Sequence, residues 1–219
     1  MGQPFTSILK TYPVVIIANG EFPSYEPALD ILRRAKVIVC CDGAYDSFLR
    51  QKIETSADIV VTGDGDSLSQ ELIARCGESF ICDKSTEYND LQKALKCCQK
   101  RKYDRVLLLG CEGKREDHFI ANLSILVTYS EKMDLAMLTR HGIFQVIREN
   151  ATLSSFNGQQ VSIFSKDPHL PLSFEGLKYP VRERCFLHLW EGSLNEATSD
   201  SFTVTLHGSG VVIVYQTLL

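Results

Sequence analysis

Two patterns of apolar positions divide the chain into an earlier and a later part. Up to about residue 140, short apolar runs alternate with longer segments of helical periodicity. Several runs carry no polar alternation, as expected for strands that are covered on both faces. The predicted strands are Val14–Ala18, Val37–Cys41, Ile59–Thr62, Phe80–Cys82, Val106–Leu109 and Leu135–Leu138. The predicted helices lie near Glu26–Ala35, Ala44–Gln51, Ser69–Cys76, Asp90–Lys100 and Asp117–Ser130. This alternation predicts a doubly wound, mostly parallel α/β domain.

Helical periodicity disappears after about residue 142. Short apolar runs then alternate with turn signals such as Asn157-Gly158 and Gly208-Ser209-Gly210. The predicted strands are Phe144–Arg148, Gln160–Phe164, Phe186–Leu189, Phe202–Leu206 and Val211–Tyr215. We therefore expect a C-terminal antiparallel β-sandwich and place the two domains at residues 1–142 and 143–219.

Composition narrows the class of protein. The chain has 219 residues, 44% of them hydrophobic and 23% charged, which is typical of one large or two small globular domains. The net charge of −4, without a basic run, argues against a nucleic-acid partner. No apolar run approaches the roughly 20 residues that cross a membrane. The eight cysteines include the adjacent pairs Cys40-Cys41 and Cys97-Cys98 and show no C-x-x-C spacing. We interpret them as reduced residues of a cytoplasmic protein.

Acidic residues follow several of the predicted parallel strands. Asp42 follows the second strand, Asp64 and Asp66 follow the third, and Asp90 begins the helix after the fourth. Because doubly wound sheets bind ligands beyond the carboxyl ends of their strands, these side chains are expected to meet at one edge. Aspartate is also an ordinary turn and helix-cap residue, so one loop alone means little. A cluster of carboxylates would repel itself unless a hard cation such as Mg²⁺ lies among them.

Two loops are the most informative. Gly63-Asp64-Gly65-Asp66-Ser67 places two carboxylates two residues apart on a loop that glycine makes adaptable. The segment Gly110–His118 supplies glycines, whose N–H groups can approach phosphate, together with the cations Lys114 and Arg115. Neither the Walker A spacing nor a G-x-G-x-x-G after the first strand is present. These loops favour a magnesium and phosphate site that is not of the common P-loop or dinucleotide type.

An ordered set of motifs resembles the thiamine pyrophosphokinase family. The set spans about residues 14–215 and includes C-terminal segments at Gly176–Pro180 and Ser193–Glu196. Its N-terminal members are Asp42-Gly43-Ala44, Gly63-Asp64-x-Asp66-Ser67, Asn89-Asp90-Leu91, Gly113-x-Arg115-x-Asp117-His118 and Ala121-Asn122. Each motif alone is moderately specific, and the ordered set is strongly so. The family's architecture, an α/β domain followed by a β-sandwich, agrees with the change of pattern near residue 142.

The resemblance implies a reaction and a set of site residues. The enzyme would transfer pyrophosphate from ATP to the hydroxyl of thiamine, giving thiamine diphosphate and AMP with Mg²⁺ as cofactor. We expect an ATP- and Mg²⁺-binding N-terminal domain, a thiamine-binding C-terminal domain, and a homodimer with the thiamine site at its interface. The expected catalytic residues are Asp64, Asp66, Asp90 and Asp117, of which Asp64, Asp66 and Asp90 bind the metal. The expected ATP and phosphate contacts are Asp42, Gly43, Ser67, Lys114, Arg115, His118 and Asn122, and the thiamine contacts are Trp190, Ser193 and Asn195.

The chain departs from the family pattern at two positions. Asn89 stands where members commonly have threonine, and a polar side chain is retained there. Leu194 stands where a serine is usual, so any hydrogen bond from that serine to thiamine is lost. Trp190 has a second interpretation besides stacking on thiamine, namely that it belongs to the sandwich core.

Two other functions remain open on sequence grounds. Another Mg²⁺-dependent Asp-x-Asp transferase that uses a nucleotide would share the metal and the donor but not the acceptor. A protein that binds thiamine or a nucleotide without catalysis would need no metal carboxylates, so the acidic loops argue against it.

Overall fold

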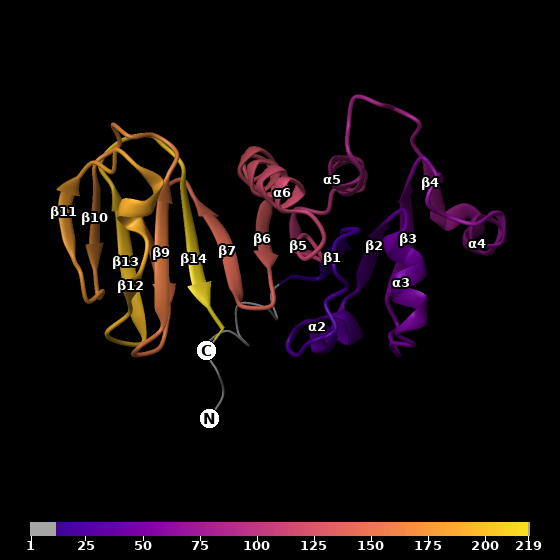
Figure 1. The fold of residues 1–219 in the computed structure, drawn as a ribbon, viewed down its shortest axis with the longest axis horizontal. Coiled ribbons are helices and arrows are strands. Elements are labelled where there is room, and N and C mark those ends of the chain that lie inside the picture. Colours follow the sequence, from indigo (N-terminus) through magenta and orange to yellow (C-terminus); the bar gives the residue numbers. More distant parts are fainter. Residues whose placement is uncertain (1–11, 219) are drawn as a thin grey trace. The chain divides into compact units, whose positions relative to one another are not determined.

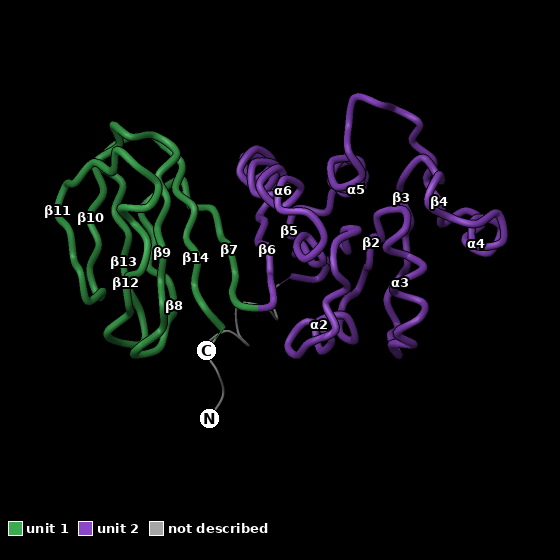
Figure 2. The backbone as a smooth tube through the Cα atoms, in the orientation of Figure 1, with its two compact units in different colours: residues 1–8, 141–219 green, residues 9–140 purple. Residues whose placement is uncertain are grey.

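The computed structural model describes residues 12–218, and the chain divides after Arg140 into two compact units. Figure 2 shows the N-terminal unit in purple and the C-terminal unit in green. Among the described residues, no helix has the length and apolar character that crossing a membrane requires.

The N-terminal unit is built on a parallel sheet with the strand order β6-β5-β1-β2-β3-β4. The strands are β1 (Val14–Ile17), β2 (Val37–Cys41), β3 (Asp58–Gly63), β4 (Phe80–Cys82), β5 (Arg105–Leu109) and β6 (Asp134–Leu138). All residues of β1 and β2 are buried. Strands that are covered on both faces are apolar at every position, which explains the unbroken apolar runs in the sequence. All six strands predicted for this part of the chain are confirmed, with bounds within one residue.

Helices cover both faces of this sheet. They are α2 (Ala28–Arg34), α3 (Ala44–Arg50), α4 (Gln70–Cys76), α5 (Asp90–Lys100) and α6 (Glu116–Tyr129), with a short 3-10 helix, η1 (Gly77–Ser79). Right-handed crossovers place helices on opposite faces when the chain moves in opposite directions along the sheet. The step from β1 to β3 therefore leaves α2 and α3 on one side, and the return to β5 and β6 leaves α5 and α6 on the other (Figure 1).

The beginning of α5 is fixed by a capping box. The side chain of Asn89 accepts a hydrogen bond from the N–H of Gln92 at 2.9 Å, and Gln92 accepts one from the N–H of Asn89 at 3.3 Å. Such a pair satisfies two donors that a helix start otherwise leaves without partners. Asn89 therefore performs a capping role for which threonine is also suited. Asp90 is thereby held in the first turn of the helix.

The C-terminal unit consists of two antiparallel sheets. One has the order β12-β9-β14-β7 and the other β11-β10-β13-β8. The strands are β7 (Gly142–Ile147), β8 (Ala151–Ser154), β9 (Gln160–Ser165), β10 (Leu172–Glu175), β11 (Val181–Arg184), β12 (Asn195–Glu196), β13 (Ser201–Leu206) and β14 (Val212–Thr217). Alternate residues of β9, β13 and β14 point into a shared core that includes Ile163, Phe174, Phe202 and Val214. The predicted antiparallel sandwich after an α/β part is confirmed.

One predicted strand is wrong and several were not predicted. Phe186–Leu189 forms no strand; its end enters a 3-10 helix, η2 (Leu189–Gly192). Phe186 is buried in the sandwich core, whereas Leu187 and Leu189 are more than 60% exposed, so the apolar run that suggested a strand lies only partly in the core. The missed strands β8 and β11 lie at sheet edges; three of the four residues of β11 are charged, and β8 is half polar. Edge strands of this kind lack the apolar signal on which sequence patterns depend.

Candidate active site

The strand order creates a switch point between β1 and β5. From β1 the chain proceeds through β2, β3 and β4 and then returns to add β5 on the opposite side of β1. Loops leaving β1 and β5 therefore diverge to opposite faces and leave a crevice between them, where doubly wound proteins bind their ligands. A cavity of about 410 Å³ lies at this point. Its lining includes Asn19 and Gly20 after β1, Lys114 and Arg115 after β5, and Asp90 at the start of α5.

Three aspartates from neighbouring loops form an acidic cluster. Asp42 follows β2, and Asp64 and Asp66 follow β3. One carboxylate oxygen from each of the three lies within 4.8 Å of the others. Ser67 ties the cluster together, because its N–H donates to Asp42 at 3.2 Å and its hydroxyl donates to Asp66 at 3.0 Å. The loops converge as predicted, although Asp42 rather than Asp90 completes this group of three.

Asp42 is the buried member of the cluster. It is fully inaccessible to solvent, and its Oδ1 atom has no hydrogen-bond partner among the described residues. Gly63 permits this packing, since a Cβ atom there would lie 2.6 Å from Cβ of Asp42. Burial raises the pKa of Asp42 to about 6, and the nearby carboxylates of Asp66, Asp90 and Asp64 act in the same direction.

Lys93 connects the acidic cluster to α5. Its Nζ atom lies 3.3 Å from Oδ2 of Asp64 and 3.3 Å from Oδ1 of Asp90, and its side chain is only 3% exposed. Burial acts to lower the pKa of Lys93, but the hydrogen bond to Asp64 and the charge of Asp90 outweigh it and raise that pKa. The pKa of Asp64 is lowered, first by the N–H of Asp66 and then by Lys93. The sequence prediction missed Lys93, although a lysine three residues after Asp90 on the same helix is positioned to pair with that aspartate.

The donor set suits a divalent cation. All the available ligand atoms are carboxylate oxygens, two of the aspartates are exposed, and the third carries a buried oxygen that lacks a partner. Hard cations such as Mg²⁺ bind oxygen ligands of this kind and share them with phosphate groups. Exposed carboxylates alone would be weak evidence. The oxygen of Asp42 that lacks a partner is the stronger indication, because an unpaired buried acceptor is costly.

The loop after β5 presents charged and polar groups to the same cavity. Lys114 donates to Oδ1 of Asn19 at 3.1 Å, and this bond joins the loops after β5 and β1. Asn122 donates to the carbonyl of Cys111 at 3.0 Å and, with His118, lines the cavity. These contacts hold the expected phosphate-binding loop against the switch point.

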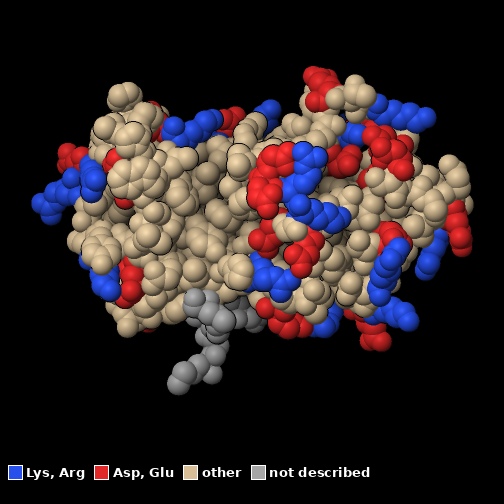
Figure 3. All heavy atoms as spheres, viewed as in Figure 1, with Lys and Arg blue, Asp and Glu red and all other residues tan. Residues whose placement is uncertain are grey.

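Arg115 and Asp117 pair with each other at the surface. Nε of Arg115 lies 3.0 Å from Oδ1 of Asp117, and both side chains are at least 60% exposed. The hydrogen bonds from Arg115 lower the pKa of Asp117. Asp117 is therefore ionised at neutral pH and available as a hydrogen-bond acceptor. Figure 3 shows charges of both signs interspersed over the N-terminal unit on the face in view.

The three predicted thiamine contacts lie in the C-terminal unit within one short segment. Trp190 is 72% exposed, so the alternative that places it in the sandwich core is wrong. Its ring stacks on that of His188 at 6.0 Å between centroids. Ser193 donates to the carbonyl of Trp190 at 2.6 Å and closes the turn of η2. Leu194, at the position of the usual serine, is 80% exposed.

Asn195 differs from these neighbours because it is buried and its side chain makes three hydrogen bonds within the protein. Its side-chain oxygen accepts from the N–H groups of Tyr179 at 3.0 Å and Glu196 at 2.9 Å. Its amide nitrogen donates to the carbonyl of Tyr179 at 2.8 Å. These bonds tie β12 to the segment that precedes β11, so the structure gives Asn195 a structural role in addition to any contact with a ligand.

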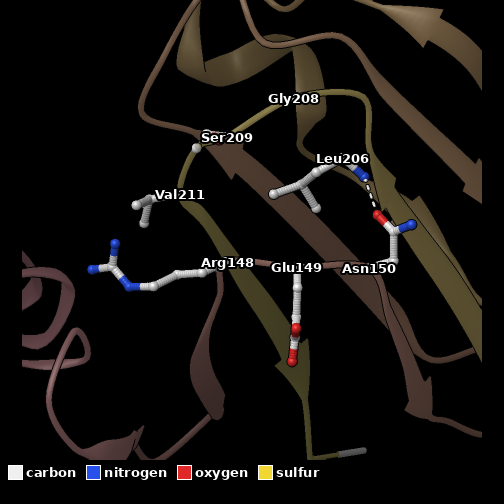
Figure 4. Close-up of a pocket in the computed structure, with 8 residues that line it drawn as sticks. Arg148, Glu149, Asn150, Leu206, Gly208, Ser209 and Val211 are labelled. Carbon is white, nitrogen blue, oxygen red and sulfur yellow. Dashed lines mark hydrogen bonds between the residues drawn. The ribbon is translucent and has the colours of Figure 1, made fainter.

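A second depression in the C-terminal unit contains no predicted site residue. It has a volume of about 770 Å³ and lies between the end of β7 and the loop that joins β13 to β14. Arg148, Glu149 and Ser209 are among its lining residues, and Asn150 accepts a hydrogen bond from the N–H of Leu206 at 2.9 Å (Figure 4). Its lining brings together no cluster of like charges that would indicate a ligand.

Comparisons with known proteins agree with this geometry. Residues 28–137 match the model for "Thiamin pyrophosphokinase, catalytic domain", and residues 142–215 match that for "Thiamin pyrophosphokinase, substrate-binding domain". Thiamin pyrophosphokinase 1 of Caenorhabditis elegans is 26% identical over 123 residues, which cover 53% of this chain and 50% of that protein. Thiamine pyrophosphokinase 2 of Oryza sativa subsp. japonica is 26% identical over 209 residues, covering 83% of this chain and 77% of that protein. The match thus spans half the length of the nematode relative.

Solved structures share the fold. Thiamin pyrophosphokinase from Candida albicans superposes with a TM-score of 0.80 at 19% identity, covering 98% of this chain and 91% of that one. The enzyme from Bacillus subtilis gives a TM-score of 0.77 at 18% identity, covering 93% and 98%. At these identities the likeness establishes the architecture, while the two family models together cover most of the chain. The chain therefore belongs to the thiamin pyrophosphokinase family, whose members are kinase-type transferases.

Proposed function

We propose that this protein transfers the pyrophosphoryl group of ATP to the hydroxyl of thiamine, producing thiamine diphosphate and AMP. The observation that carries the proposal is the meeting of carboxylates from separate loops beside the switch-point cavity. Family membership supports the two substrates. A triphosphate in this cavity would lie between the cations of the loop after β5 and the acidic cluster.

The carboxylates would hold Mg²⁺. Asp64 and Asp66 are the proposed direct ligands, and Asp42 or Asp90 would complete the set directly or through water. The ion would neutralise charge on the phosphate oxygens, which is its usual contribution to phosphoryl transfer. Lys93 would keep Asp64 and Asp90 in place by its two ion pairs.

The remaining residues of the N-terminal unit would bind and orient the reactants. Lys114 and Arg115 would hold phosphate oxygens, while His118, Asn122 and Gly43 would line the nucleotide site. Ser67 keeps Asp66 oriented and is a further candidate phosphate contact. Asp117 would orient the thiamine hydroxyl and accept its proton as the oxygen attacks the β-phosphorus. The bond from that phosphorus to the oxygen that it shares with the α-phosphorus would then break, and AMP would leave with this oxygen.

The C-terminal unit would supply the thiamine contacts. The exposed ring of Trp190 is suited to stack on the cationic thiazolium or the flat pyrimidine. Ser193 and Asn195 are the proposed polar contacts, with most of the capacity of Asn195 already used by Tyr179 and Glu196. Exposed apolar side chains at Leu187 and Leu189 support a homodimer in which this segment is covered. We propose a cytoplasmic location for the enzyme.

An AMP assay tests the proposed reaction. Purified protein is incubated with Mg²⁺ and ATP, with and without thiamine, and AMP and ADP are separated by chromatography. The proposal predicts AMP release that depends on thiamine, with one thiamine diphosphate formed for each AMP. Turnover of a nucleotide-sugar without thiamine dependence would favour the other transferase. Thiamine binding without any AMP at saturating ATP would favour a binding protein that does not catalyse.

A further inference from the structure

A second cavity in the N-terminal unit shares no lining residue with the switch-point cavity. It has a volume of about 510 Å³ and lies between α5 and the ends of β3 and β4. Figure 1 shows the segment that joins β4 to α5. Asp83, Ser85 and Tyr88 of this segment belong to the lining of the cavity. A volume of this size is within the range of small-molecule sites, about 300–1,000 Å³.

Cations dominate the charged lining of this basic cavity. Lys93, Lys96 and Lys100 are spaced by three and four residues and therefore share one face of α5, and Arg101 follows the helix directly. The lining contains one carboxylate, Asp83, which already accepts a hydrogen bond from the N–H of Ser85 at 2.9 Å.

A row of lysines on a helix is most often a solvated face, and two observations argue against that interpretation here. Lys93 is buried, with a side chain that is only 3% exposed. Lys96 is half-buried, and its ammonium group lies over the ring of Tyr88. These two charges are held in defined positions, whereas a solvated lysine samples many conformations at little cost.

Thr62 has a hydroxyl group that lacks a hydrogen-bond partner within the described part of the chain, and this observation is independent of the lysines. It lies near the end of β3, is 1% exposed, and lines the basic cavity. Its hydroxyl oxygen is buried and has no hydrogen-bond partner among the described residues. A buried hydroxyl without a partner is costly, and a ligand that offers oxygen atoms would remove this cost.

We propose that the basic cavity binds the phosphate group of a small molecule, as a site separate from the proposed ATP site. Phosphate offers the oxygen acceptors that ammonium, guanidinium and hydroxyl groups require. Lys93 lies in this lining and also contacts Asp64 and Asp90. An occupant would therefore share one ammonium group with the acidic cluster and would influence the proposed metal ligands. That consequence depends on the proposed function, whereas the binding itself does not.

Lysine footprinting tests the site on the full chain without Mg²⁺ or thiamine. The protein is acetylated in the presence of a chelator, and modification is read for each lysine by mass spectrometry. Inorganic phosphate and AMP are added in separate arms, which distinguish free phosphate from a phosphate ester. The proposal predicts that one of them protects Lys96 and Lys100, while the exposed Lys36 keeps its reactivity. Protection of Lys114 alone would place the ligand only in the switch-point cavity and would overturn the proposal.

A charge-reversal variant provides a second test of the proposal. Lys100→Glu should weaken binding of the protecting ligand by roughly tenfold, because it replaces an attraction by a repulsion at the cavity rim. Lys102→Glu is the matched control, since Lys102 is exposed and lies outside the lining. Unchanged affinity in Lys100→Glu, or an absence of protection at Lys96 and Lys100 with both ligands, would contradict the proposal. Because no step requires catalysis, either result is independent of the AMP assay.

Discussion

The ammonium group of Lys93 lies 3.3 Å from the carboxylate of Asp64 and joins α5 to the loop after β3. Lys93 is buried, whereas the side chain of Asp64 is 38% exposed. A second ion pair, to Asp90, has the same length. Lys93 thus offsets the repulsion between two carboxylates that the proposed chemistry needs close together.

Replacing Lys93 should therefore disturb both stability and turnover. Lys93→Met keeps the buried stem but removes the charge that Asp64 and Asp90 share. We expect the free energy of unfolding to fall by about 1–2 kcal/mol, since both carboxylates are partly solvated, and turnover to fall by about tenfold or more. Urea unfolding and the AMP assay measure the two effects. Lys36→Met, at an exposed position, is the control, and equal behaviour of the two variants would refute the role of Lys93.

The raised pKa of Asp42 predicts a pH dependence of stability. Its pKa of about 6 in the folded state exceeds the ordinary value of 3.8, so the folded protein keeps a proton that the unfolded chain has already released. The free energy of unfolding should consequently fall as pH rises from about 4 to about 6 and stay lowered above that, by on the order of 1–3 kcal/mol. Asp42→Asn should lack this contribution.

The measurement is urea unfolding at several pH values with a chelator present. The difference between wild type and Asp42→Asn should change across this pH window and then level off. Asp58→Asn serves as the control, because Asp58 is exposed at the other end of β3. If the difference between wild type and Asp42→Asn were the same at all pH values, Asp42 would not titrate as described.

Replacing Asp117 should lower turnover more than it weakens nucleotide binding. Its exposed carboxylate pairs with Arg115 and remains ionised at neutral pH, which suits a group that orients the acceptor hydroxyl. Asp117→Asn keeps the shape but removes the charge, so we expect turnover to fall by about 10²-fold or more with little change in ATP affinity. Steady-state kinetics and equilibrium binding of ATP separate the two quantities. Equal losses in both would instead assign Asp117 to the nucleotide.

Asn195 should contribute mainly to the stability of the C-terminal unit. Asn195→Ala leaves the N–H groups of Tyr179 and Glu196 without their acceptor and should lower the free energy of unfolding by about 1–3 kcal/mol. Asn157→Ala, in an exposed turn, should cost less than about 0.5 kcal/mol. Denaturant titrations of the two variants give the comparison. A rise in the KM for thiamine at unchanged stability would show a ligand contact in place of the structural role.

The N-terminal unit could be predicted well because its strands are buried on both faces. Runs such as Val37–Cys41 are apolar at every position, and the loop that follows each strand must emerge at the same edge of a parallel sheet. The convergence of Asp42, Asp64 and Asp66 follows from this topology alone. The topology alone does not predict which of the three aspartates is buried, because that depends on how closely Gly63 packs against Asp42.

Features that depend on tertiary contacts could not be predicted from the sequence. The spacing of Lys93 from Asp90 is visible in the sequence, but its ion pair with Asp64 joins residues 29 positions apart and is not. Phe186–Leu189 resembles a strand because its apolar residues do not reveal that two of them are exposed. The hydrogen bonds between Asn195 and Tyr179 join residues 16 positions apart, and no local sequence pattern predicts them.

The central claim is that the acidic cluster holds the divalent ion that accompanies ATP, and Mn²⁺ binding tests it most directly. Electron paramagnetic resonance measures Mn²⁺ bound to the full chain with ATP, for wild type, Asp66→Asn and the control Asp58→Asn. Asparagine at position 66 can still accept the hydrogen bond from Ser67, so the fold should be retained. We predict that Asp66→Asn weakens binding by about tenfold or more while Asp58→Asn leaves it unchanged. Equal affinity in all three proteins would contradict the account.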